Sequence, residues 1–142
     1  MLRPVAFWDA SVLVPLCVSQ TPTLRALLFE GKYQMAVWWA THVEVASAMV
    51  RLLRRQEITA IVYAEAKLQA EGLANIWRVI APSAEVSCNA RALLELYPLR
   101  AADALQLAAA LAWCEGKPQG NVFLTFDLRL REAAGQAGFA LE

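Results

Sequence analysis

Five short hydrophobic runs recur along the chain, separated by stretches that mix polar and apolar residues. Each run is apolar throughout and does not alternate with polar positions. This pattern suits buried parallel strands that are covered on both faces. The predicted strands are residues 5–8, 35–39, 77–80, 121–125 and 139–141.

The stretches between these runs carry apolar residues at helical spacing. They predict helices over residues 23–30, 41–55, 58–73, 85–96, 101–114 and 128–137. Thr41 and Glu44 have the spacing of a capping box at the start of their helix. Strands that alternate with helices predict an α/β fold, with a parallel sheet between layers of helix. We expect one domain spanning residues 1–142.

Composition narrows the class of protein. A hydrophobic content of 58% in 142 residues exceeds the roughly 45–50% of an average globular chain, which suggests an interface as well as a core. The 13 basic and 13 acidic residues balance, so no overall positive field attracts nucleic acid. Cys17, Cys88 and Cys114 are far apart and odd in number, which predicts buried thiols in a reducing compartment. No apolar stretch reaches membrane-spanning length, so we expect a cytoplasmic protein.

The chain contains only three aspartates, and each one stands beside apolar residues. Asp9 follows the first predicted strand, Asp127 follows the fourth, and Asp103 lies among alanines. Buried carboxylates cost free energy unless a partner compensates their charge. This placement therefore calls for a common explanation.

A shared position at one edge of the sheet would supply that explanation. Parallel strands end on the same edge, where ligands bind in open α/β sheets. Glu44 and Asp103 begin helices that start at the edge where Asp9 and Asp127 lie. Ionised carboxylates about 4–5 Å apart repel by roughly 3–4 kcal/mol per pair at an effective dielectric near 20. Mg²⁺ or Mn²⁺ would replace this repulsion with coordination and polarise a water for phosphodiester cleavage. Closeness along the edge depends on the strand order.

Other interpretations of these acids stay open. Each aspartate suits a helix N-cap, Asp103 and Gln106 have nearly the spacing of a capping box, and Glu44 can pair with Thr41. A phosphoryl-handling receiver or phosphatase also uses an aspartate at a strand end. A phosphatase of that kind needs a second Asp where Ser11 stands. A binding module without catalysis is a third alternative.

Four segments together resemble the PIN-domain family, and within it the VapC-type toxins of toxin–antitoxin pairs. They are residues 7–14, 41–45, 99–108 and 123–130, in the family's order. The resemblance implies a three-layer α/β/α sandwich with a five-stranded parallel sheet of order 3-2-1-4-5. It also implies an endoribonuclease dependent on Mg²⁺ or Mn²⁺, a homodimer, an RNA substrate and inhibition by a small antitoxin.

The same resemblance assigns roles to individual residues. Asp9, Glu44 and Asp103 match the catalytic core acids, with Asp9 and Asp103 holding the metal most directly. Asp127 matches a fourth, more variable acid, and Ser11 matches a small hydroxyl residue that supports the first one. Trp8, directly before the first acid, is bulkier than is usual in the family.

Basic and aromatic residues supply further candidates. Arg129 and Arg131 follow Asp127 and are candidates to contact substrate phosphate. The arginines that end the predicted helix 41–55 suit the negative end of its dipole, with contact to phosphate or a partner as the alternative. For Trp38 and Trp39 we expect core packing, with base stacking by an exposed ring as the alternative.

Overall fold

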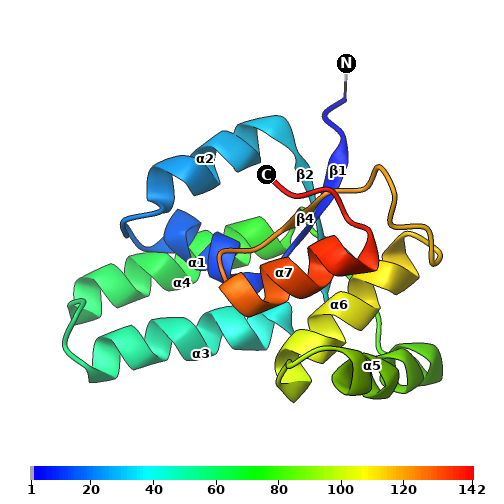
Figure 1. The fold of residues 1–142 in the computed structure, drawn as a ribbon. Helices are drawn as coiled ribbons and strands as arrows, with labels where there is room; N and C mark the ends of the chain where they lie inside the picture. The colour runs from blue at the N-terminus through cyan, green and yellow to red at the C-terminus, as the bar shows by residue number, and fades with distance from the viewer. Residues whose placement is uncertain (1) are drawn as a thin grey trace.

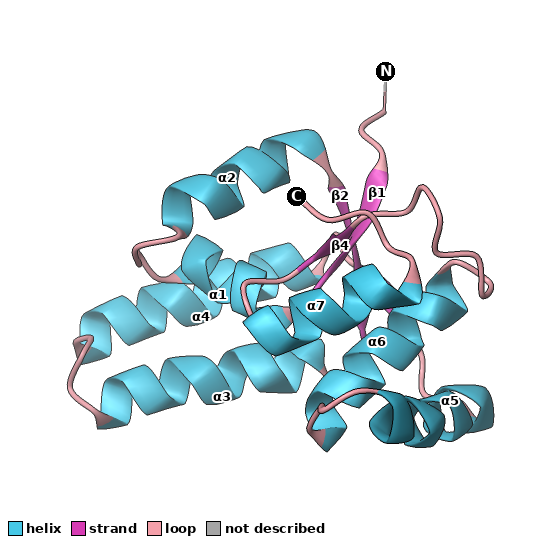
Figure 2. Ribbon diagram, viewed as in Figure 1, coloured by secondary structure: helices cyan, strands magenta, loops and turns pink. Residues whose placement is uncertain are grey.

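The computed structural model describes residues 2–142, which form a parallel sheet between two layers of helix (Figures 1 and 2). The sheet of the described residues has four strands in the order β3-β2-β1-β4. In the register, Val5 of β1 lies opposite Gln34 of β2, and Trp8 of β1 lies opposite Leu124 of β4. The strands are β1 (Val5–Trp8), β2 (Gln34–Trp38), β3 (Arg78–Ile80) and β4 (Phe123–Leu124).

The helices divide between the two faces of the sheet. Helices α1 to α4 cover one face, and α5, α6 and α7 cover the other. Figure 1 shows α3 and α4 side by side as a hairpin, with α5 and α6 on the opposite side of the molecule. The helices are α1 (Ala10–Cys17), α2 (Thr23–Lys32), α3 (Thr41–Arg54), α4 (Ala60–Ala74), α5 (Ala84–Leu96), α6 (Ala101–Trp113) and α7 (Leu128–Ala137).

Successive strand residues contribute to different hydrophobic cores. Trp8 and Leu124 pack toward α1–α4, whereas Phe7 and Phe123 pack toward α5–α7, with their rings 5.4 Å apart. Burying each large apolar side chain contributes roughly 1.5–3 kcal/mol. The uninterrupted apolar runs are explained by this arrangement, because both faces of every central strand are buried.

The fifth predicted strand is reduced to a single bridge between Val122 and Ala140. That bridge lies beside β4, where the order 3-2-1-4-5 expects it. The chain turns at Gly138, whose φ of +113° favours glycine, forms this bridge at Ala140 and then leaves the sheet. Glu142 instead contacts the side chains of Lys32 and Tyr33 at the end of α2, so the strand stays short.

Helix α1 was not predicted, because Pro15 and two valines disfavour a helix in this segment. Asp9 starts the helix as its N-cap, and tertiary packing overrides the weak local propensity.

The predicted capping box at Thr41 and Glu44 is wrong. Helix α3 starts after Ala40, a residue without a capping side chain, and Thr41 is the first helical residue. The Thr41 hydroxyl is buried and accepts a hydrogen bond from Gln106 Nε2 at 3.0 Å. The Thr41 hydroxyl therefore links α3 to α6 and does not cap α3.

Two predictions from composition can be compared with the structure. All three cysteines are free, but Cys88 is exposed and the other two are half-buried. The prediction of buried thiols is thus wrong for Cys88. Among residues 2–142, no helix combines the length and the hydrophobicity needed to cross a bilayer.

Candidate active site

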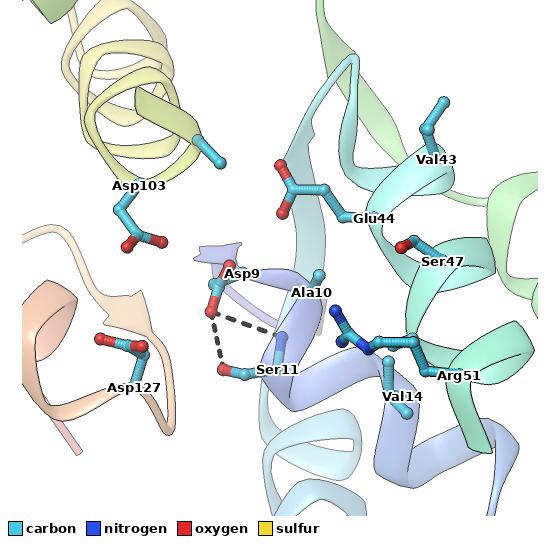
Figure 3. A pocket seen from close by; sticks show the side chains of 12 residues that line it. Asp9, Ala10, Ser11, Val14, Val43, Glu44, Ser47, Arg51, Asp103 and Asp127 are labelled. Carbon is cyan, nitrogen blue, oxygen red and sulfur yellow. Dashed lines mark hydrogen bonds between the residues drawn. The ribbon is translucent and has the colours of Figure 1, made fainter. Parts of the chain in front are cut away.

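The four predicted acids lie around one pocket at the carboxyl ends of β1 and β4. The pocket has a volume of about 470 Å³, and Asp9, Glu44, Asp103 and Asp127 all line it (Figure 3). Pairing of β1 with β4 supplies the closeness that the sequence alone left open, since the Asp9 N–H donates to Leu124 O at 3.0 Å. Their catalytic and metal-binding roles remain predictions.

Asp9 is the most buried of these acids, with an exposed fraction of 5%. Its Oδ2 atom accepts hydrogen bonds from Ser11 Oγ at 2.7 Å and from Thr125 Oγ1 at 2.8 Å. Burial raises the pKa of Asp9, and the bonds from Ser11 and Thr125 oppose that rise. Because both hydroxyls donate to the same oxygen, Oδ1 is left for another ligand.

The two hydroxyls are themselves oriented by the turn before α7. The backbone N–H of Phe126 donates to Ser11 Oγ at 2.9 Å, and that of Asp127 donates to Thr125 Oγ1 at 3.0 Å. A backbone N–H can only donate, so each hydroxyl accepts from the backbone and directs its own proton toward Asp9. This relay fixes the Asp9 carboxylate relative to the segment that carries Asp127.

Thr125 was missed by the sequence analysis, although a signal was present. It precedes Asp127 by two residues, as Ser11 follows Asp9 by two, and it ends an otherwise apolar run. A hydroxyl in that position is buried at a strand end and needs a partner.

Glu44 is held by a residue that was not predicted to belong to the site. Gln106 is fully buried on α6, and its Nε2 donates to Glu44 Oε2 at 3.1 Å as well as to Thr41. Burial raises the pKa of Glu44 to about 7, the Gln106 bond opposes this rise, and the charges of Asp9 and Asp103 add to it. A polar residue in the apolar run of α6 was the available signal.

Asp103 and Asp127 approach the pocket from the starts of α6 and α7. Asp127 is the N-cap of α7 and accepts from Leu130 N at 2.9 Å, so the capping interpretation holds for it as it does for Asp9. It is wrong for Asp103, because Arg100 is the N-cap of α6. Burial, followed by the charges of Asp127 and Asp9, raises the pKa of Asp103 to about 6.

The charge balance of the pocket fits a divalent cation. In the part of the chain that the structure describes, none of the four carboxylates pairs with a basic side chain. Their donor set consists only of carboxylate oxygens, the ligand type that Mg²⁺ and Mn²⁺ prefer. Between residues 2 and 142, no three potential ligands are yet gathered to hold an ion directly. A magnesium ion that keeps several waters needs only one or two carboxylates, so the residues fit a hydrated ion.

The arginine of this pocket is not one of the two favoured from the sequence. Arg131 donates to Glu142 O at 3.2 Å, and Arg129 lines a separate hollow beside α5. Of the described residues that line the carboxylate pocket, Arg51 is the basic one. It lies seven residues after Glu44 on α3, and Figure 3 shows its side chain reaching toward Ala10.

Comparison with known proteins identifies the family. No protein-family model matches the chain. Two relatives from Mycobacterium tuberculosis, Ribonuclease VapC45 (strain CDC 1551 / Oshkosh) and Ribonuclease VapC49 (strain ATCC 25618 / H37Rv), are each 32% identical over 136 residues. The match covers 95% of this chain and 92% of each relative. A solved structure described as a toxin–antitoxin complex from Klebsiella pneumoniae has a similar fold, with a TM-score of 0.60, 22% identity and 86% of both chains covered. With this identity along nearly the whole of both chains, the protein belongs to the VapC family of toxin ribonucleases.

Proposed function

We propose that this chain is an endoribonuclease that uses Mg²⁺ or Mn²⁺ to hydrolyse RNA, and that it is the toxin of a toxin–antitoxin pair. Its membership in the VapC ribonuclease family supports the reaction class. The observation that carries the proposal is the convergence of Asp9, Glu44, Asp103 and Asp127 on one pocket. Such a set of acids suits metal-assisted hydrolysis of a phosphodiester.

The four acids would have different roles, according to their surroundings in the pocket. Asp9 and Asp103 would hold the ion most directly, because Asp9 is oriented by two hydroxyls and keeps Oδ1 for a ligand. Glu44 and Asp127 would complete the site or orient the attacking water. A bound ion would polarise that water and offset the negative charge of the phosphate. We expect a 5′-phosphate and a 3′-hydroxyl as the new ends.

Gln106 keeps Glu44 turned into the pocket, because its amide donates to the carboxylate from a fully buried position. The pKa of Glu44 is raised to about 7, so this carboxyl group can gain or lose a proton near neutral pH. A cation nearby favours the ionised form of the same group. Glu44 is therefore placed to accept a hydrogen bond from a water in the pocket.

Arg51 is placed to bind a phosphate group of the RNA. It is exposed, it lines the carboxylate pocket, and it shares a helix face with Glu44 and Ser47. A guanidinium group matches phosphate oxygens with paired donors. It would draw the RNA backbone against the acids, which repel the RNA in the absence of metal.

Inhibition by an antitoxin is proposed on two grounds. One is the family, and the other is the similar fold in a structure described as a toxin–antitoxin complex. Exposed leucines on α2, Leu24 and Leu28, supply apolar surface of the kind that protein partners cover. Co-purification with the product of an adjacent small reading frame would test this part.

Cleavage of RNA tests the proposal. The purified protein is incubated with total RNA in Mn²⁺ or in chelator, and the new ends are mapped. We expect discrete cleavage with metal and none with chelator. Asp9→Asn and Asp103→Asn should both abolish it, whereas Glu95→Gln, which alters an exposed acid on α5, should not. Full activity in either aspartate variant would contradict the assignment.

A further inference from the structure

A second hollow adjoins the carboxylate pocket on the side of α3 and β3. It has a volume of about 320 Å³, and Trp38, Trp39, His42 and Trp77 line it. Val43 lines both this hollow and the carboxylate pocket. In Figure 3, Val43 lies on the far side of Glu44 from the three aspartates. The two hollows are therefore neighbours across one turn of α3.

The lining of this hollow, which we call the tryptophan pocket, is unusually aromatic. The lining includes three of the chain's five tryptophans. The rings of Trp38 and Trp39 meet edge to face at 6.5 Å, and those of His42 and Trp77 do so at 5.6 Å. Such pairs hold aromatic side chains in defined orientations. The pocket is thus built of rings that already support one another.

Trp39 is the most exposed tryptophan of this pocket. Its exposed fraction is 58%, whereas that of Trp38 is 5%. The backbone of Trp39 is fixed, because its N–H donates to Ile80 O at 3.0 Å just beyond β2. An exposed indole on a rigid support offers stacking surface at little cost in conformational entropy.

Two tryptophans of the pocket keep their indole N–H groups away from solvent. Within the described range, the indole N–H groups of Trp38 and Trp77 are buried without a hydrogen-bond partner. By contrast, the N–H of Trp8 in the core donates to Gln34 O at 3.1 Å. Unpaired buried donors are rare in proteins. Because these two N–H groups are closed off from solvent, a ligand in the hollow would meet the rings and not the N–H groups. The contact that the pocket offers is therefore stacking, above all on the exposed ring of Trp39.

We propose that the tryptophan pocket binds a nucleobase of the RNA strand whose phosphate lies at the four acids, with the base stacking on Trp39. This inference rests on the proposed ribonuclease function. Proteins that bind single-stranded RNA commonly stack bases on aromatic rings while basic groups follow the backbone. Arg51 in the carboxylate pocket and Trp39 beyond Val43 supply these two kinds of contact on either side of Glu44. The pocket would thereby influence which site in an RNA is cut.

Binding without cleavage tests this proposal. In an Asp103→Asn background, affinity is measured for a labelled short single-stranded RNA and for a ribose–phosphate chain of equal length without bases. Stacking is worth about 1–3 kcal/mol per base, so Trp39→Ala should weaken RNA binding about five- to 150-fold. It should leave binding of the abasic chain unchanged. Trp39→Phe should retain most of the affinity, and Leu94→Ala, which alters an exposed residue on α5, should have no effect.

Three results would overturn the proposal. The first is equal RNA affinity for Trp39→Ala and Leu94→Ala, and the second is an equal loss for both probes. The third is unchanged RNA affinity together with weaker binding of the antitoxin, which would make the pocket a protein-binding surface. Failure of the ribonuclease function would appear separately, as absence of cleavage by the unmodified protein in Mn²⁺. Since the subsite is measured by binding alone, the two failures are distinguishable.

Discussion

Replacing Thr125 by valine would test whether the hydroxyl relay positions Asp9. Valine keeps the volume and β-branching of threonine but removes the hydroxyl. That hydroxyl donates to Asp9 Oδ2 at 2.8 Å and accepts from Asp127 N–H at 3.0 Å. One charge-assisted bond is lost, and one backbone donor in the turn before α7 is left unpaired.

The expected magnitude follows from these two contacts. A hydrogen bond to a charged group is worth about 1.5–3 kcal/mol, and loss of a residue that orients a metal ligand typically costs about 10–100-fold in metal affinity or activity. We therefore expect Thr125→Val to raise the Mn²⁺ concentration needed for half-maximal cleavage by about 10–100-fold. The folded structure should persist, because the apolar packing around Thr125 is retained.

The assay is cleavage of a labelled RNA over a series of Mn²⁺ concentrations, with Thr125→Ser as the matched control. Serine restores the hydroxyl and should recover most of the metal affinity. Equal metal dependence of the valine variant and the original protein would refute the positioning role of Thr125. An equal loss in the serine variant would point instead to packing at this position.

Three further predictions concern the same pocket. The metal-free protein should lose stability as the pH rises from about 4 through about 7, because the raised pKa values of Glu44 and Asp103 make the folded state bind protons more tightly than the unfolded state. The loss in free energy of unfolding, measured by urea unfolding, should be roughly 1–2 kcal/mol after allowance for solvent exposure, and it should be smaller in Mg²⁺. If the double variant Glu44→Gln/Asp103→Asn showed the same dependence of the unfolding free energy on pH, these two groups would be excluded as its origin. Arg51→Ala should raise KM for RNA severalfold with a smaller change in kcat, whereas Arg54→Ala, on an exposed neighbour, should change neither; identical kinetics for the two variants would rule out the phosphate contact. Gln106→Leu should reduce kcat and move the acid limb of the pH–rate profile upward, because Glu44 loses the bond that favours its charged form, and a profile that does not shift would count against that bond.

The fold could be inferred from the sequence to a large extent because its central signal is simple. Strands that are buried on both faces are apolar throughout, and those runs located β1 to β4 within a few residues. Helix α1 and the short fifth strand depended on tertiary contacts instead. Pro15 disfavours a helix in the one, and in the other the chain continues to Glu142, which contacts Lys32 and Tyr33 at the end of α2.

The candidate site could be inferred only in part. The position of each acid at the carboxyl edge followed from strand ends and helix starts, but closeness along that edge needed the β1–β4 pairing. Gln106 was considered only as a capping partner of Asp103, because a single polar residue in an apolar helix does not show which neighbour it contacts. Arg51 was grouped with two other arginines at the end of α3, and the spacing did not reveal that it alone reaches the pocket.

The error at Thr41 shows a limit of local motifs. A hydroxyl residue followed three positions later by Glu matches a capping box, but the same spacing also places both side chains on one face of a helix. Here that face meets α6, so the two polar groups share Gln106 across the helices. Sequence spacing alone does not distinguish a bond within a helix from a bond between helices.

Calorimetric titration of the metal-free protein with Mn²⁺ tests most directly whether the four acids form a cation site. Binding should be clear in the unmodified protein and in Glu95→Gln, and it should be weakened at least tenfold in Asp9→Asn and in Asp103→Asn, whose urea unfolding curves should show intact folds. No heat of binding in the unmodified protein, or an affinity in either aspartate variant equal to that of the unmodified protein, would contradict the account.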